Sequence, residues 1–335
     1  MTRAGRPAKE LRAAELIGRR LTIEVPATTA NLGAGFDALA LALDLANTIE
    51  LEGVDGRGWE LTVEGEGSGA EELAPGRRNR FMAALERGLR AAGRGVPSEV
   101  GWRVHMRNEV PLGRGLGSSA AATVGGLVAA RALSALSGGT LGQQALLRLA
   151  TEMEGHPDNA AAALLGGFVV VTLVDGEAQV VRFDPPAGLL AVLFIPERRL
   201  ATRDMRAVLP AQVPRADAVF NVGRAALAVA ALASGRLDML RAGTEDRLHE
   251  PYRAAIYPEL PRLVAAAREA GALGACLSGA GSTVIAFIDS EARAEGVAAA
   301  MASEASNLKL DGRAARVRPR SAGAILRDER LTREH

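Results

Sequence analysis

The chain has 335 residues, with 40 basic and 39 acidic side chains and a formal net charge of +1. This balance argues against a general nucleic-acid binder, because such a protein needs a surplus of cations to displace counterions from phosphates. The single cysteine, Cys276, excludes an intramolecular disulfide framework and any zinc or iron–sulfur site that needs several cysteines.

Neither a membrane anchor nor a secretion signal is indicated. The longest apolar run, residues 160–174, has fifteen residues with two glycines inside it, which is too short to span a bilayer. No apolar segment follows the basic residues at the start of the chain, so this start does not resemble a signal peptide. Aromatic residues make up only 3%, too few for stacking platforms that bind single-stranded nucleic acid. We therefore expect a cytoplasmic protein with no membrane or nucleic-acid partner.

The first twenty residues are expected to form an exposed extension, followed by a first domain over residues 21–185. Alternation of polar and apolar residues predicts four strands, of which residues 59–64 alternate cleanly, as is typical of an antiparallel strand. Apolar side chains at positions 81, 82, 85 and 89 have the spacing of an amphipathic helix over residues 79–92. The four strands are residues 21–25, 48–51, 59–64 and 102–110.

Two further helices are predicted in the first domain. Residues 118–136 are apolar nearly all round, which is typical of a buried helix. Residues 141–154 form a second helix that runs into a turn at residues 155–159. Strand-like segments follow at residues 169–173 and 180–183.

A second domain is expected over residues 186–328. Its strands and helices are mixed without strict βαβ alternation, which favours an α+β fold over a doubly wound sheet. The predicted strands are residues 189–195, 275–277, 283–288 and 314–318, the last of which completes the chain. The predicted helices are residues 203–208, 217–234, 237–248, 259–270 and 291–306.

A glycine-rich loop before the buried helix is the strongest local signal for chemistry. Its three alternate glycines let the backbone turn tightly and approach a ligand closely. The helix that follows opens on two serines, and its free N–H groups and dipole favour an anion such as phosphate. No lysine follows the last glycine, which excludes a Walker A loop, and a plain turn before a buried helix stays an alternative. The candidate phosphate-binding residues are Pro111, Leu112, Gly113, Arg114, Gly115, Leu116, Gly117, Ser118, Ser119, Ala120 and Ala121.

Two more loops have compositions suited to ligand binding. The loop at residues 26–37 directly follows the first strand, and its Asn31 and Asp37 can offer acceptors to an ammonium or hydroxyl group. The loop at residues 277–283 is a glycine turn between two strands. Either loop, taken alone, is as well explained by a simple connection.

The turn after the helix at residues 141–154 gathers ionisable side chains. Glu152, Glu154 and His156 suit a divalent cation together with a polar substrate. With four histidines and one cysteine in the chain, a zinc site is not expected. Carboxylates beside a phosphate loop favour Mg²⁺, which prefers oxygen ligands. A single glutamate at this place is also explained as part of a solvated helix face.

Taken together and in this order, these segments resemble the GHMP kinase superfamily. The sequence at residues 111–121 is similar to the phosphate loop of that superfamily. Within it, Ala-Asn-Leu-Gly-Ala-Gly-Phe-Asp at residues 30–37 and Glu-Gly-His-Pro-Asp-Asn at residues 154–159 resemble the homoserine kinases. The loop at residues 277–283 lacks the proline that the third motif of the superfamily commonly carries. The likeness covers about residues 21–325.

The resemblance implies the two-domain GHMP kinase fold of the α+β class. Its N-terminal domain is like the second domain of ribosomal protein S5, its C-terminal domain is ferredoxin-like, and the site lies in the cleft between them. ATP and Mg²⁺ are the implied cofactors, and L-homoserine is the implied substrate, which becomes O-phospho-L-homoserine on the route to threonine. A homodimer is the family-level expectation. Two alternatives stay open: another GHMP kinase with a mevalonate- or shikimate-type acceptor, and a non-catalytic ATP-binding protein of the same fold.

The resemblance also implies roles for single residues at the phosphate end. The loop residues 113–119 would hold the phosphates of ATP, and Ser119 with a helix carboxylate would bind Mg²⁺. Glu152 stands four residues before His156, so it is preferred to Glu154 as that carboxylate. The implied catalytic residues are Asn31, Ser119 and Glu152.

At the other end, the resemblance places the amino-acid substrate. Asp37 would face its ammonium group, and two arginines would face its carboxylate, because their planar fork pairs with carboxylates bidentately. These are Arg206 and Arg253. Asp158 is kept as a contributor without being named as the base. The residues expected to line the substrate are Asn31, Asp37, His156, Asn159, Thr202, Arg206 and Arg253.

Overall fold

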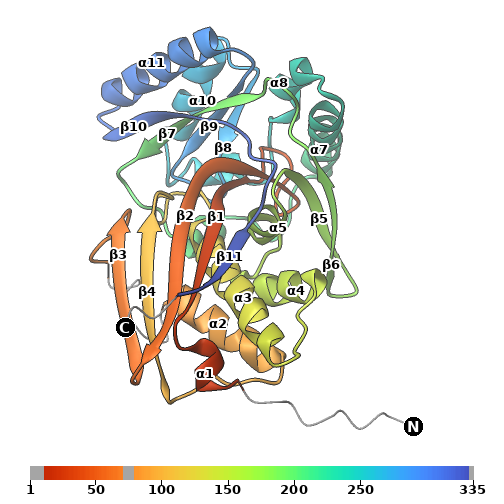
Figure 1. The fold of residues 1–335 in the computed structure, drawn as a ribbon. Coiled ribbons are helices and arrows are strands. Elements are labelled where there is room, and N and C mark those ends of the chain that lie inside the picture. Colours follow the sequence, from red (N-terminus) through yellow and green to blue (C-terminus); the bar gives the residue numbers. More distant parts are fainter. Residues whose placement is uncertain (1–10, 71–78, 332–335) are drawn as a thin grey trace.

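The computed structural model describes residues 11–70 and 79–331, which build two sheets with helices packed on them (Figure 1). The larger sheet has seven strands. Along its main path the order is β11-β1-β2-β4-β3, while β5 pairs with β2 and β6 pairs with β5. Its strands are β1 (Arg19–Ala30), β2 (Leu39–Asp55), β3 (Gly58–Gly65), β4 (Val100–Asn108), β5 (Phe168–Val174), β6 (Glu177–Phe183) and β11 (Ile325–Arg330).

The helices of this first domain cover one face of the larger sheet. Asn79 caps the start of α2 by accepting a hydrogen bond from the backbone N–H of Met82 at 3.2 Å. The long α3 is buried along most of its length between α2 and the sheet, as its apolar composition predicts. These helices are α1 (Ala13–Leu16), α2 (Arg80–Ala91), α3 (Ser118–Leu136), α4 (Gln143–Glu154) and α5 (Asp158–Leu165).

The smaller sheet has four antiparallel strands in the order β10-β7-β9-β8, with α11 connecting β9 to β10. This order is the ferredoxin-like arrangement that the resemblance implied. Its strands are β7 (Leu190–Pro196), β8 (Gly274–Leu277), β9 (Val284–Ile288) and β10 (Gly312–Val317). The helical elements are α6 (Thr202–Ala207), α7 (Arg215–Ser234), the 3₁₀ turn η2 (Leu237–Met239), α8 (Leu240–Gly243), α9 (Glu250–Arg253), α10 (Leu260–Glu269) and α11 (Glu291–Asn307).

One hydrophobic cluster is shared between the two sheets. Leu39 and Leu41 of β2 belong to the same buried group as Leu193 of β7 and Ile285 of β9. The chain changes from the larger to the smaller sheet between Phe183 and Leu190. Because the two domains share a packed core, the walls of the cleft between them are held at a fixed spacing.

Both ends of the expected domains need correction. The extension expected over the first twenty residues is wrong for residues 11–20, because Leu16 is 1% exposed in the core and β1 already begins at Arg19. Residues 1–10 lie outside the described residues. The second domain does not run to residue 328, because β11 returns to the larger sheet and pairs antiparallel with β1. The strand at residues 314–318 is therefore not the last one.

Two local expectations also differ from the structure. The strand at residues 59–64 is not antiparallel: β3 pairs with β4 in parallel, and α2 lies between them in the sequence. Alternation reports one buried face, which an edge strand of either direction can have. The turn expected at residues 155–159 is shorter than predicted, because α5 begins at Asp158.

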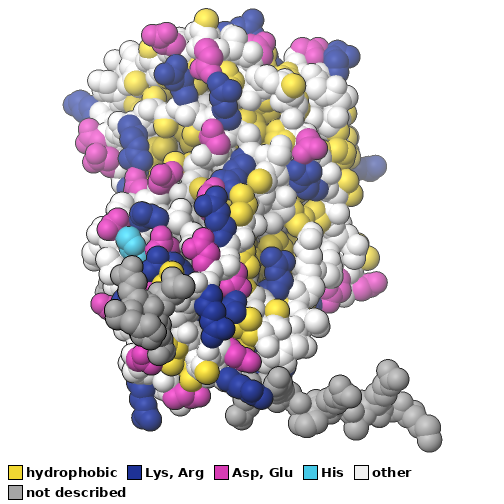
Figure 2. All heavy atoms as spheres, viewed as in Figure 1, with side chains coloured by type: hydrophobic (Ala, Val, Ile, Leu, Met, Phe, Trp, Pro, Cys, Tyr) yellow, Lys and Arg dark blue, Asp and Glu magenta, His cyan; other side chains and the backbone are white. Residues whose placement is uncertain are grey.

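By length and composition, two described helices are apolar enough to cross a membrane. In α3 the apolar stretch is 67% buried, as expected for a core helix, whereas in α7 only 22% is buried. On the face shown in Figure 2, basic and acidic side chains are interspersed over both domains.

Candidate active site

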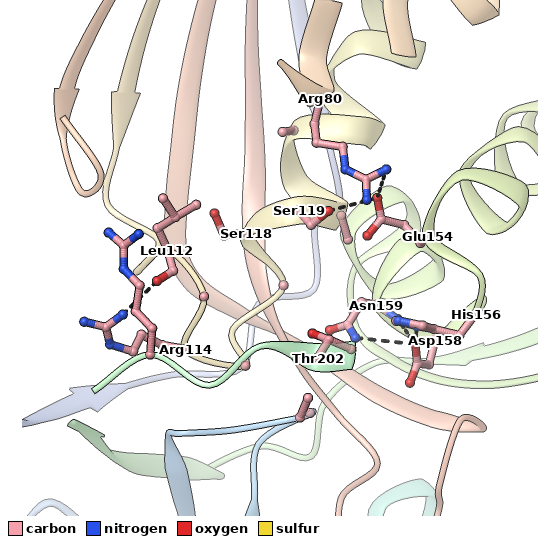
Figure 3. Close-up of a pocket in the computed structure, with 18 of the residues that line it drawn as sticks. Arg80, Leu112, Arg114, Ser118, Ser119, Glu154, His156, Asp158, Asn159 and Thr202 are labelled. Atoms are coloured by element: carbon pink, nitrogen blue, oxygen red, sulfur yellow. Dashed lines mark hydrogen bonds and ion pairs between the residues drawn. The ribbon is translucent and has the colours of Figure 1, made fainter. Parts of the chain in front are cut away.

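A cavity of about 350 Å³ lies where the two domains meet. The glycine-rich loop and the start of α3 form one wall, and the turn before α5 forms another (Figure 3). The loop after β1 and helix α6 close it from the second-domain side. Segments that are far apart in the sequence therefore line one cavity.

The loop at residues 277–283 connects β8 to β9 and also holds the glycine-rich loop in place through hydrogen bonds. Ser278 donates its hydroxyl to the carbonyl of Gly115 at 2.7 Å, and the N–H of Thr283 donates to the carbonyl of Arg114 at 3.1 Å. Gly115 has a φ of +75°, and a Cβ there would collide with the carbonyl oxygen of Ser278. The loop thus delivers the chain to Ser118, where α3 begins and its first N–H groups have no partner inside the helix. This end of the cavity suits an anion.

The structure places Glu154, and not the preferred Glu152, in the cavity, so the preference for Glu152 is wrong. Glu154 accepts hydrogen bonds from Ser119 at 3.1 Å and from Thr123 at 2.6 Å, with a side chain that is 6% exposed. Glu152 points away from the cavity and pairs with Arg87 and Arg148, and the hydrogen bond from Arg87 holds the pKa of Glu152 below its usual value.

Helix geometry explains why Glu154, and not Glu152, faces the cavity. Residues two apart in an α-helix lie on nearly opposite faces, so only one of the two glutamates can face α3. The helix ends at Glu154, and Gly155 then turns the chain with a φ of +82°, so His156 is not on the same helix. The four-residue spacing to His156 therefore does not put Glu152 beside it.

The turn after α4 brings a buried acid beside the histidine. Nδ1 of His156 lies 2.6 Å from Oδ1 of Asp158, whose side chain is 2% exposed. Burial lowers the pKa of His156, but the hydrogen bond and charge of Asp158 outweigh it, so that the pKa stands above its usual value. Asn159 is fixed by Thr28, whose hydroxyl lies 2.7 Å from Oδ1 of the amide. His156, Asp158 and Asn159 all line the cavity.

An ion pair crosses the second-domain end of the cavity. Arg206 on α6 donates two hydrogen bonds to Asp37, at 3.0 and 2.6 Å. Hydrogen bonding to Asp37 raises the pKa of Arg206. Both side chains are about one third exposed and face the cavity. One carboxylate oxygen each of Asp37 and Asp158 and one ring nitrogen of His156 lie within 4.8 Å of one another. This end therefore presents opposite charges side by side.

Among the described residues, Arg253 is the largest fully buried side chain, and it lies behind that ion pair. It donates to the carbonyls of Met205 at 3.2 Å and Gly279 at 3.0 Å. Burial, followed by the nearby charge of Arg206, lowers its pKa to about 10. The amide of Asn31 donates to the same Gly279 carbonyl at 2.8 Å and accepts from the N–H of Asp37 at 3.0 Å.

Most of the candidate residues meet in this cavity, and three of the phosphate-loop candidates do not. Pro111, Leu116 and Ala121 are buried in the core, where they support the loop and do not line the cavity. The remaining loop candidates, from Leu112 to Ala120, line it, as do all seven residues expected at the substrate.

Sequence reasoning missed an apolar part of the cavity beside the glycine-rich loop. Ile49 on β2 pairs with Met106 on β4, and both line the cavity together with Ala122 of α3. Each is one apolar residue within an alternating strand or helix, so no local motif marks it. Strand pairing alone would reveal this surface. Asn47, Arg80, Asn108 and Arg199 also line the cavity without belonging to a motif, whereas Gly279 and Ala280 lie in the loop at residues 277–283 that the sequence did single out.

Comparison with known proteins identifies relatives of both domains. The family model of the GHMP kinase N-terminal domain matches residues 79–167, and that of the C-terminal domain matches residues 228–307. The homoserine kinase of Streptomyces avermitilis is 45% identical over 90% of this chain and 96% of its own length. That of Moorella thermoacetica is 46% identical over 79% of this chain and 86% of its own length. The crystal structure of homoserine kinase from Cytophaga hutchinsonii has a TM-score of 0.81 at 30% identity, covering 92% of this chain and 97% of its own.

Proposed function

The chain belongs to the homoserine kinases of the GHMP kinase family and is an ATP-dependent kinase, and we propose that its cleft transfers the γ-phosphoryl group of ATP to the side-chain hydroxyl of L-homoserine. This proposal rests on the arrangement of charged and polar groups in a single cavity. Its anion-binding helix end and its pair of opposite charges face the same space. Phosphoryl transfer depends mainly on such positioning and on charge neutralisation.

ATP would lie along the glycine-rich loop. The first N–H groups of α3 and the backbone of residues 113–119 would hold its phosphates, because helix N-termini favour anions. The base would enter the apolar part of the cavity between Ile49, Met106 and Ala122, where a flat ring can bury its faces.

The residues at the start of α3 fit Mg²⁺. Ser119 and Glu154 bring a hydroxyl and a carboxylate oxygen together at 3.1 Å, beside the place assigned to the phosphates, and oxygen is the donor that Mg²⁺ prefers. When bound, the ion would neutralise charge on the transferred phosphoryl group. Thr123, which donates to Glu154 from within the helix, would keep that carboxylate turned toward the ion.

L-Homoserine would be recognised as a zwitterion. Asp37 would take its ammonium group and Arg206 its carboxylate, so that the substrate exchanges with the ion pair these two side chains make with each other. Arg253 adds positive charge behind the carboxylate. His156 and Asn159 line the same cavity and would orient the hydroxyl toward the phosphates.

A kinase assay across acceptors tests this function. ADP release would be measured with L-homoserine, mevalonate, galactose and shikimate, and the product identified by phosphorus NMR. We expect turnover with L-homoserine alone. Turnover with only a non-amino-acid acceptor would reassign the chain within the superfamily, and ATP binding without any turnover would make it a non-catalytic member.

We further propose that the protein is a cytoplasmic homodimer without a nucleic-acid or membrane partner. The exposed face of α7 supports a second protein surface as its neighbour. Most of its exposed side chains are small, so they bury little area in lipid but allow another helix to approach closely.

A further inference from the structure

His249, at the start of α9, touches both the arginine and the loop that line the substrate end of the cavity. It is 0% exposed and does not line the cavity itself. Given homoserine as the substrate, we propose that His249 is a positioning residue that fixes the Asn31–Asp37 loop and Arg253 relative to each other. This inference rests on the proposed function and names a residue to which none of the considerations above gave a role.

Two hydrogen bonds from one imidazole ring make this connection. Nε2 of His249 lies 2.9 Å from the carbonyl oxygen of Gly33, and Nδ1 lies 3.1 Å from Nη1 of Arg253. A carbonyl only accepts and a guanidinium only donates, so Nε2 must carry the proton and Nδ1 must be bare. The surroundings thus select one neutral tautomer: protonation of Nδ1 would remove the bond from Arg253, and a tautomer flip would remove both bonds.

Packing holds the same groups in place. The ring of Phe36, in the loop with Asp37, stacks on His249 with centroids 5.1 Å apart. The guanidinium groups of Arg206 and Arg253 each lie 5.4 Å from the centroid of that phenyl ring. Gly33 is fixed as well, since a Cβ there would collide with the backbone of Thr244. The loop therefore cannot shift without disturbing His249.

The backbone of His249 is itself anchored by Asp246. That carboxylate accepts from the N–H groups of Leu248 at 3.1 Å, His249 at 2.8 Å and Glu250 at 2.7 Å. The charged groups around the ring are Asp246, whose Oδ2 lies 3.7 Å from Nε2, together with Arg253 and Asp37. Burial lowers the pKa of His249 to about 4, which keeps the ring neutral at physiological pH.

Two substitutions of similar shape each remove one of the two hydrogen bonds of His249 and keep the other. In His249→Asn the side-chain amide falls near the place of Nδ1 and can still accept from Arg253, whereas in His249→Gln it falls near Nε2 and can still donate to Gly33. Each variant loses one bond, so we expect the KM for homoserine to rise roughly tenfold in both, with the KM for ATP unchanged and kcat little affected. His249→Phe, which keeps the stacking and neither bond, should raise the KM for homoserine further.

Controls distinguish positioning from general loss of stability. Leu263→Ala removes a fully buried side chain of α10 in the core on the other side of the small sheet, and it should lower stability without changing either KM. An unchanged KM for homoserine in both folded isosteric variants would overturn the proposal, as would an equal rise in both KM values.

The tautomer gives a readout that does not depend on the substrate. Two-bond proton–nitrogen NMR correlations distinguish the Nε2–H tautomer, and the chain has only four histidines, so loss of one signal in His249→Asn assigns it. We expect the neutral Nε2–H form from pH 8 down to about pH 5. The Nδ1–H form would overturn the proposal. A wild-type protein that shows the expected tautomer but does not phosphorylate homoserine would instead refute the proposed function.

Discussion

Glu154 and Glu152 provide a matched pair of carboxylates two residues apart. Glu154 accepts from Ser119 inside the cavity, whereas Glu152 pairs with Arg87 and Arg148 on the outer face of α4. We expect Glu154→Gln to lower kcat roughly a hundredfold and to raise the Mg²⁺ concentration needed for half-maximal rate, because one charged oxygen ligand is lost. Glu152→Gln should leave both quantities near the wild-type values. Equal effects of the two substitutions on the Mg²⁺ dependence would refute this assignment.

Arg206 has a natural control on its own helix. Arg206→Ala removes the partner assigned to the substrate carboxylate, so the KM for homoserine should rise by about tenfold to a hundredfold while the KM for ATP stays unchanged. Arg203, three residues earlier on α6, has a side chain that is 91% exposed, and Arg203→Ala should change neither KM. Steady-state kinetics with each substrate varied in turn would measure both. Equal damage to the two KM values in Arg206→Ala would mean that this arginine does not bind the carboxylate.

Glu250, next to His249, gives a prediction about pH and stability. Burial raises its pKa to about 7 from an ordinary value of 4.5, and its Oε1 accepts from the N–H of Leu277 at 2.6 Å. A raised pKa means that the folded state holds the proton more tightly, so this stabilisation is fully present below pH 4.5 and is lost as the pH rises through 7.

Glu250→Gln keeps an acceptor for Leu277 but does not ionise. Relative to wild type, its free energy of unfolding should therefore increase by about 2 kcal/mol between pH 5 and pH 8. Urea unfolding of both proteins at the two pH values measures this difference. A constant difference between the proteins across that range would show that the carboxyl does not titrate there.

The positions of candidate site residues were predictable from the sequence where a motif fixes the local backbone. Asn31, Asp37 and His156 lie in short turns, and the structure places all three in the cavity. Glu152 was misplaced because helix geometry, and not distance along the chain, decides which face a side chain takes. Ile49 and Met106 were missed because only the pairing of β2 with β4 brings them together.

At the scale of elements, the shape of the glycine-rich loop depends on Gly115, where a side chain would collide with a neighbouring loop. Gly115 combines a φ of +75° with a backbone neighbour, the carbonyl of Ser278, in the space a Cβ would fill. Gly138 has a similar φ of +78°, but nothing lies within 4 Å of the place that a Cβ would take there. Comparing the two alanine variants therefore separates backbone strain from collision between loops.

We expect Gly138→Ala to cost about 1 kcal/mol of unfolding free energy with no change in the KM for ATP. Gly115→Ala should cost more, on the order of 3 kcal/mol, and should raise the KM for ATP because the loop must move away from the 277–283 segment. Chemical denaturation and ATP kinetics on both variants would test this. Equal losses with no change in the KM for ATP would show that the contact with Ser278 does not shape the loop.

The two ends of the fold show what sequence patterns do not reveal about elements. β11 contains few apolar residues, and its side chains are mostly exposed, so its sequence resembles a charged tail. It becomes a strand because β1 offers an unpaired edge more than three hundred residues earlier. By contrast, α3 was predicted with its observed bounds, because an uninterrupted run of small and apolar residues between a glycine loop and a polar turn specifies a buried helix by itself.

For the whole molecule, the net charge of +1 conceals how an anion is bound. Among the described residues, five arginines line the cavity proposed for ATP, but Arg206 is already paired with Asp37 and Arg253 is buried. Backbone N–H groups at the start of α3, together with the ion that Ser119 and Glu154 would hold, would add to the attraction for phosphate. Binding charge is therefore placed locally, while the surface in Figure 2 stays mixed in sign.

The exposed face of α7 is the feature of the whole molecule that a single chain leaves unexplained. Val219 is 64% exposed and Val222 is 71% exposed, on a helix of which 22% of the apolar stretch is buried. Most of the exposed side chains around them are small, which favours close packing against a second helix, although the exposed Arg215 lies one turn before Val219. A two-fold axis through this face would make it contact its own copy. The exposed residues of this face are Ala216, Val219, Val222, Gly223, Ala226, Ala230 and Ala233.

We expect sedimentation velocity to show a dimer for the wild type and a monomer for Val222→Asp, because a carboxylate buried at a two-fold contact has no partner and costs several kcal/mol. Ala302→Asp, on an exposed position of α11 in the same domain, adds the same charge and should remain dimeric. Flotation with vesicles of phosphatidylcholine and phosphatidylglycerol tests whether α7 instead binds a membrane surface. We expect the wild type not to float with the vesicles. A monomeric wild type would refute the dimer, and a dimeric Val222→Asp would place the contact on another face.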